Sequence, residues 1–200
     1  MSNKKVRFFF DYQSPYSYFA ANLIEEICDR HGAEVHWEPM VLGGIFQKDE
    51  TTPLFRRPKR AEYLDQDMEN TATYLGLNYK KRTEFLFNSI NAMRATLQIP
   101  QGKERGKAVK ALFRAVFEDD QNLGDMPTLQ KYLDAAGFDG ATLVAGTQDQ
   151  AVKDQLKANT DEADSLGVFG APTAIMDDGK MFWGHDRMNM LDYFLEKTKE

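Results

Sequence analysis

The stretch FFFDYQSPYSYFA, residues 8–20, decides the fold of this 200-residue chain. Residues 5–11 form a short, apolar and aromatic run, which predicts a buried strand that ends at turn residues. Ser14 then fits a helix N-cap, and Pro15 fits the first helical position, where a missing N–H costs nothing. Apolar residues follow at helical spacing as far as Cys28, so the strand leads directly into an amphipathic helix.

A second strand completes this opening unit. The helix is expected to end at His31 and Gly32, because glycine is favoured just past a helix C-terminus. Residues 34–39, EVHWEP, alternate between polar and apolar side chains and predict a strand. Strand, helix and strand in succession indicate a βαβ unit, with parallel strands and a right-handed crossover.

The middle of the chain is predicted to be helical and its end to return to β structure. Helical apolar spacing is found at residues 62–75, 82–97, 104–117, 127–136, 140–146 and 148–165. Residues 173–176 and 181–183 predict a hairpin around Asp177-Asp178-Gly179, and Gly184-His185-Asp186 opens a last helix. The sequence therefore predicts one α/β fold, in which a βαβ unit is followed by a ββα unit and a helical block is inserted between them.

Composition excludes several classes of protein. The net charge of −6 argues against nucleic-acid binding, which normally requires a basic surface. The apolar runs are too short to cross a bilayer, so no membrane span is expected. A single cysteine, Cys28, excludes an intramolecular disulfide, indicates a cytoplasmic protein, and is expected to be buried. The three histidines lack ligand spacing, so no metal site is expected.

Three stretches carry a resemblance to a known family. FDYQSPYSYFA at 10–20, GVFGAPTAIM at 167–176 and FWGHDRMNML at 182–191 resemble the 2-hydroxychromene-2-carboxylate isomerases and the related kappa-class glutathione transferases. The resemblance implies a thioredoxin-like domain at 1–50 and 166–200, with an all-helical insertion domain at 55–165. It also implies glutathione as the cofactor and a homodimer.

The first turn of the first helix is the predicted catalytic position. Ser14 and Ser17 stand where redox thioredoxins have two cysteines, so disulfide exchange is excluded. A helix N-terminus lowers the pKa of a thiol placed there, and the glutathione thiol would otherwise titrate at about 8.5. We predict that Ser14 donates a hydrogen bond to that thiolate. The alternative is that Ser14 is an ordinary N-cap, and Ser17 is interpreted as structural.

Two further positions are assigned to glutathione through the resemblance. It implies that the Ala171–Pro172 bond is cis and faces the first helix, so that backbone groups of Ala171 pair with the cysteine of glutathione. The alternative is a trans proline in a plain turn. Asp186 matches the acidic residue that holds the γ-glutamyl amine, although it also fits a helix cap. His185 departs from the Ser, Asn or Gln usual there, and the alternative for it is an exposed loop residue.

The remaining candidates are less tightly tied to a motif. The resemblance implies that Lys59 reaches the cofactor, whereas the alternative is a solvated charge run over residues 55–60. Tyr16 lies either at the pocket mouth or in the core. Asn91 and Arg94 share one helix face, where Arg94 would bind a substrate carboxylate; the alternative is a buried structural pair.

These observations predict a glutathione-dependent enzyme that isomerises a small aromatic carboxylate of the 2-hydroxychromene-2-carboxylate type by transient thiolate addition. A kappa-like glutathione transferase is the first alternative. The second is a non-catalytic thioredoxin-fold protein that binds a thiol or a peptide.

Overall fold

A mixed β-sheet forms the centre of the computed structural model, which describes residues 4–48, 58–84 and 86–198. Strand β1 (Lys4–Phe10) pairs in parallel with β2 (Ala33–Pro39), as the βαβ prediction requires. Strand β3 (Thr173–Met176) runs antiparallel to β1, and β4 (Met181–Trp183) antiparallel to β3. The strand order within this described part is β2-β1-β3-β4, which is the thioredoxin-like arrangement.

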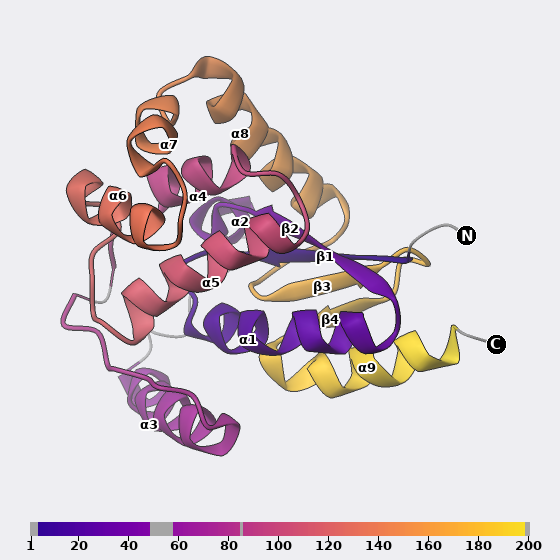
Figure 1. Cartoon of the computed structure of the whole chain (residues 1–200). Helices are drawn as coiled ribbons and strands as arrows, with labels where there is room; N and C mark the ends of the chain where they lie inside the picture. Colours follow the sequence, from indigo (N-terminus) through magenta and orange to yellow (C-terminus); the bar gives the residue numbers. More distant parts are fainter. Residues whose placement is uncertain (1–3, 49–57, 85, 199–200) are drawn as a thin grey trace.

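Helices cover both faces of the sheet (Figure 1). Helices α1, α5 and α9 pack on one face, and α2 and α8 pack on the other. The bounds are α1 Pro15–Arg30, α2 Leu42–Lys48, α3 Pro58–Leu75, α4 Ile90–Leu97, α5 Lys103–Phe117, α6 Met126–Ala135, α7 Gly140–Gly146, α8 Gln150–Ser165 and α9 Met188–Lys197, with a 3-10 helix at His185–Arg187. The helical block α3–α8 is thus inserted between β2 and β3.

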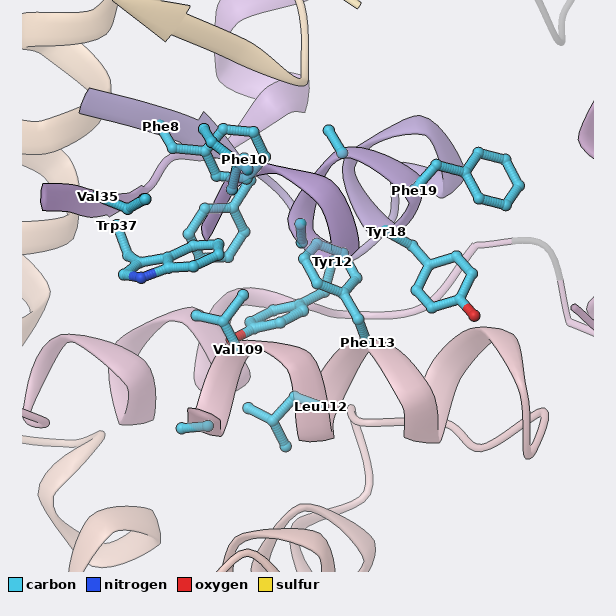
Figure 2. Close-up of a cluster of buried hydrophobic side chains, with 14 of the residues drawn as sticks. Phe8, Phe10, Tyr12, Tyr18, Phe19, Val35, Trp37, Val109, Leu112 and Phe113 are labelled. Carbon is cyan, nitrogen blue, oxygen red and sulfur yellow. The ribbon is translucent and has the colours of Figure 1, made fainter. Parts of the chain in front are cut away.

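An aromatic core joins the sheet to this helical insertion (Figure 2). Phe8 and Phe10 of β1 point to the α1 and α5 face, whereas Phe9 points to the α2 and α8 face. The ring of Phe10 lies 5.7 Å from the ring of Phe113 in α5 and 6.1 Å from the ring of Trp37 in β2. Because one cluster includes residues of both parts, α5 contributes directly to the core that supports β1. The proposed division into two domains stays a prediction.

The structure differs from the predicted elements at two places. Residues 82–84 and 86–89 are not helical, so the prediction of a helix from residue 82 is wrong. The guanidinium of Arg82 donates to the carbonyls of Val116 and Gln121, at 3.2 and 2.7 Å, which holds this segment against the end of α5. No helix was assigned from the sequence at α2, whose segment LGGIFQK contains two helix-disfavouring glycines.

Two expected absences can be compared with the structure. No helix in the described residues is long and apolar enough to cross a membrane. Over the same described ranges, no group of three or more His, Cys, Asp or Glu side chains is placed to hold a metal ion. Cys28 is buried in α1, as predicted, and burial raises the pKa of its thiol to about 12.

Candidate active site at the start of α1

Ser14 lies at the junction of the β1–α1 turn and the loop before β3. It is the N-cap of α1, and its Oγ accepts a hydrogen bond from the Ser17 N–H at 3.1 Å. The same hydroxyl donates to the carbonyl oxygen of Ala171 at 3.0 Å, although the two residues are far apart in sequence. Ser14 is therefore an N-cap, as one alternative required, and its hydroxyl also faces the loop that the catalytic interpretation required.

The loop opposite Ser14 has the predicted backbone conformation. The Ala171–Pro172 peptide bond is cis, so the trans alternative is wrong. The Pro172 carbonyl accepts a hydrogen bond from Gly184 N–H at 2.9 Å, which ties the loop to the end of β4. The N–H of Ala171 has no hydrogen-bond partner within the described residues. Ala171 thus offers a free backbone donor together with the carbonyl that contacts Ser14.

His185 and Tyr16 form a stacked pair beside this loop. Their ring centroids are 5.1 Å apart and their planes differ by 7°. His185 is half-buried, so the alternative of an exposed loop residue is wrong. Burial lowers the pKa of His185, which leaves the imidazole uncharged at neutral pH. The hydroxyl of Tyr16 donates to Oδ2 of Asp67 in α3 at 2.6 Å, so Tyr16 belongs partly to the core and partly to the rim of the site.

Asp186 presents a carboxylate next to the stacked pair. Its side chain is 57% exposed and lies 3.0 Å from the guanidinium of Arg187. The N-cap positions of the 3-10 helix and of α9 are held by Gly184 and Arg187, so Asp186 occupies neither and the helix-cap alternative is wrong. Gly184, two residues earlier, has φ +100°, and a Cβ there would lie 2.5 Å from Oδ1 of Asp186. Gly184 therefore lets the acidic side chain fold back toward the end of β4.

Lys59 is not joined to this cluster. It lies in the exposed first turn of α3, and the described residues give it no hydrogen bond or ion pair. Residues 55–57 of the basic segment lie outside the described residues. Helix α3 itself does reach the site, because its Asp67 holds the Tyr16 hydroxyl. Glutathione binding by Lys59 stays a prediction.

Asn91 and Arg94 lie on α4 and make no described contact with the Ser14 cluster. Both are half-buried, and Asn91 Oδ1 and Arg94 Nε are buried atoms without a hydrogen-bond partner. The two side chains do not bond to each other within the described residues, which argues against a structural pair. The link to the site runs through Ser89, just before α4, whose Oγ accepts from the Gln13 amide at 3.3 Å.

Sequence reasoning missed two acidic residues. Asp11 follows β1 and is fully buried beneath the turn that carries Ser14. Its place at the strand end, three residues before Ser14, was a signal that could have been used. Asp67 lies on a polar helix distant in sequence from Tyr16, so no local pattern indicated their contact.

Comparisons with known proteins agree with this geometry. The DSBA-like thioredoxin domain matches residues 5–196. The chain is 27% identical over 211 residues to glutathione S-transferase kappa 2 of Caenorhabditis elegans, covering 98% of this chain and 93% of the relative. It is 24% identical over 201 residues to 2-hydroxychromene-2-carboxylate isomerase of Sphingobium xenophagum, covering 96% and 98%.

The fold is also found among solved structures. A structure of 2-hydroxychromene-2-carboxylate isomerase superposes with a TM-score of 0.87 at 23% identity, over 97% of this chain and 95% of that one. At this identity the superposition supports the fold alone. The family match over residues 5–196 shows that the chain belongs to the DSBA-like thioredoxin domain family.

Proposed function

We propose that this protein is a glutathione-dependent isomerase of the 2-hydroxychromene-2-carboxylate type. One observation carries the proposal: the Ser14 hydroxyl, at the N-terminus of α1, lies 3.0 Å from the carbonyl of Ala171, directly before a cis proline. The turn holds Ser14 and Ser17 and no cysteine, so the protein itself supplies no thiol there. Relatives named as kappa transferases and as isomerases, at 24–27% identity, support the same class of chemistry.

The groups around Ser14 fit a thiol-containing tripeptide. The free N–H of Ala171, with its carbonyl, offers the donor and acceptor that an extended peptide backbone needs. The exposed carboxylate of Asp186 suits an ammonium group. The stacked rings of Tyr16 and His185 add an uncharged aromatic surface next to Asp186 in the chain. Glutathione carries an amine, amides and a thiol, which match these features in kind.

When bound, glutathione supplies the thiolate that adds to a conjugated substrate and leaves again. The chain's own contribution is to keep that sulfur ionised. Ser14 would redirect its hydroxyl hydrogen from the Ala171 carbonyl to the sulfur, and the N-terminus of α1 adds a favourable partial charge. Lowering the thiol pKa from about 8.5 by about two units requires about 2.7 kcal/mol. One hydrogen bond to a charged group contributes about 1.5–3 kcal/mol, which is of that size.

Arg94 is proposed to bind the substrate carboxylate. It is a half-buried arginine with no carboxylate or carbonyl partner among the described residues, and burial of a charge without a partner is unfavourable. A ligand carboxylate would provide the missing partner, because the guanidinium binds carboxylates through two parallel hydrogen bonds. The unpartnered Oδ1 of Asn91, on the same helix, would accept from a substrate hydroxyl.

Product analysis tests the proposal. The purified protein, glutathione and 2-hydroxychromene-2-carboxylate should give the trans-o-hydroxybenzylidenepyruvate isomer, with glutathione unconsumed and required. A glutathione conjugate as the product would instead identify a kappa-like transferase, the alternative favoured by the 27% identity to a kappa relative. Binding of glutathione with neither product would indicate a non-catalytic thiol-binding protein.

The homodimer implied by the resemblance and the cytoplasmic location indicated by the single cysteine stay predictions. Light scattering after size-exclusion chromatography would measure the mass of the assembly directly. A mass of one 22.9 kDa chain would contradict the dimer.

A further inference from the structure

Asp11 is a fully buried carboxylate beneath the Ser14 turn. Its Oδ1 accepts from the Gln13 N–H at 3.0 Å and from the Ser89 hydroxyl at 2.8 Å. Its Oδ2 accepts from the Leu42 N–H at 3.0 Å, and its backbone carbonyl accepts from the Ser14 N–H at 3.0 Å. One residue therefore holds the turn before α1, the first residue of α2 and the residue before α4.

Burying the Asp11 carboxylate costs folding stability, and a function at the site would explain why a carboxylate is present there. No lysine or arginine is paired with Asp11 in the described residues, and burial raises its pKa. All the groups that contact its carboxylate are donors, which favours the ionised form and opposes the effect of burial. A buried charge held only by neutral donors is costly for stability, whereas an apolar side chain would be easier to bury.

Ser89 also helps to fix the β1–α1 turn in place. It is 1% exposed and stands at the N-cap position of α4, yet its side chain makes no capping bond there. Its hydroxyl donates to Asp11, and its oxygen accepts from the Gln13 amide. Ser89 thus forgoes a stabilising helix-capping bond and instead binds two residues of the turn, Asp11 and Gln13.

We propose that Asp11 is a positioning residue of the Ser14 site: its carboxylate fastens the β1–α1 turn to α2 and α4 and so holds the Ser14 hydroxyl opposite Ala171. This inference rests on the proposed function, because a well-placed hydroxyl matters only if an anionic sulfur is bound there. It also connects the site to α4, the helix that carries Arg94. Asp11 does not touch the reacting atoms in this account.

The test compares Asp11→Ala and Asp11→Asn with Tyr12→Phe as a matched control. Tyr12 is the next residue, and its hydroxyl makes a buried 2.6 Å hydrogen bond to Thr96 of α4, so the control loses a bond between the same two segments. The readout is the pKa of the glutathione thiol bound to each variant, followed by ultraviolet absorbance of the thiolate. Asp11→Ala should raise that pKa by about one unit, a tenfold change in thiolate equilibrium.

The other variants test whether the shift in thiol pKa is specific to the Asp11 carboxylate. Asp11→Asn keeps one acceptor oxygen and should give an intermediate shift, while Tyr12→Phe should give none. Should Asp11→Ala fail to fold, Ser89→Ala removes one of the donors to the Asp11 carboxylate, together with the acceptor of the Gln13 amide, and should shift the thiol pKa in the same direction by a smaller amount. A thiol pKa unchanged in every Asp11 and Ser89 variant, or shifted equally by Tyr12→Phe, overturns the proposal.

A ligand-free measurement separates this inference from the proposed function. Amide hydrogen exchange at Gln13 should become faster in Asp11→Ala than in Tyr12→Phe, because the Gln13 N–H donates to the carboxylate that this variant removes. Exchange at Ser14 should also become faster as the turn loosens, although its N–H donates to the backbone carbonyl of residue 11, which the variant keeps. If the unaltered protein binds no glutathione, the proposed function fails whatever the exchange result. If it binds glutathione but exchange at these amides is the same in both variants, the positioning role alone fails.

Discussion

Removal of the Ser14 hydroxyl should raise the pKa of the bound glutathione thiol and leave the thiol in place. In the structure this hydroxyl donates to the Ala171 carbonyl at 3.0 Å, and in the proposed complex it donates to the sulfur. A loss of about 2 kcal/mol of charge-assisted hydrogen bonding corresponds to about 1.5 pKa units. If the bound thiol titrates near 6.5, Ser14→Ala should move it to about 8.

The effect on activity should depend on pH in a calculable way. At pH 7 the thiolate fraction would fall from about three-quarters to about one-tenth, which predicts about eightfold slower isomerisation. Near pH 9 both proteins would hold the sulfur mostly as thiolate, so their rates should converge. The assay is the pH–rate profile at saturating glutathione, together with ultraviolet titration of the bound thiol.

A matched control is needed because Ser14 also caps α1. Asp125 caps α6 in the same way, accepting from the Thr128 N–H at 3.0 Å, and lies on the exposed surface. Asp125→Ala should lose about 1 kcal/mol of stability and leave the thiol pKa unchanged. If Ser14→Ala isomerises the substrate eightfold more slowly at pH 9 as well as at pH 7, the assigned role of the hydroxyl is refuted.

Three other substitutions follow from the same geometry. Gly170→Ala should weaken glutathione binding about tenfold in calorimetry, because the added Cβ would lie 2.5 Å from the indole nitrogen of Trp183 and displace the cis-proline loop. Gly43→Ala is the control, because a Cβ there meets nothing within 4 Å, and equal glutathione affinity of the two variants would contradict this reasoning. Arg94→Gln should raise KM for the carboxylate substrate by about tenfold without changing the affinity for glutathione, and equal KM values in steady-state kinetics would exclude a carboxylate partner. Because burial lowers the pKa of His185, the unfolded chain binds a proton before the native chain does, so stability should fall as the pH drops below about 6.5. His185→Phe keeps a flat ring on Tyr16 and should flatten this pH dependence in urea titrations; a slope identical to that of the unaltered protein would show that His185 is not desolvated in the native state.

The fold was largely predictable because its elements are local patterns. The apolar run of β1, the cap and proline of α1 and the hairpin around Gly179 are each readable within a few residues, and the structure has them where expected. The helix predicted from residue 82 failed because Arg82 instead bonds to carbonyls in the last turn of α5 and just beyond it, a tertiary contact that local spacing cannot show. Helix α2 was missed because tertiary contacts, the burial of Ile45 and the hydrogen bond from Leu42 to Asp11, outweigh the low helix propensity of its two glycines.

The residues of the candidate site that belong to short sequence motifs were predictable, and the other residues were not. Ser14, Ala171 and Asp186 belong to short stretches whose resemblance to a family supplied their roles, and the structure brings the three segments together through the Ser14–Ala171 bond and the Gly184–Pro172 bond. The contact of Asp67 with Tyr16 depends on how α3 docks, which no local pattern encodes.

A crystal structure of the protein with bound glutathione would show whether Ser14 holds the sulfur. We expect the sulfur within hydrogen-bond distance of Ser14 Oγ, with the peptide backbone paired to Ala171 and the γ-glutamyl amine at Asp186. Tripeptide bound elsewhere, or a sulfur that leaves the Ser14–Ala171 hydrogen bond intact and contacts neither residue, would contradict it.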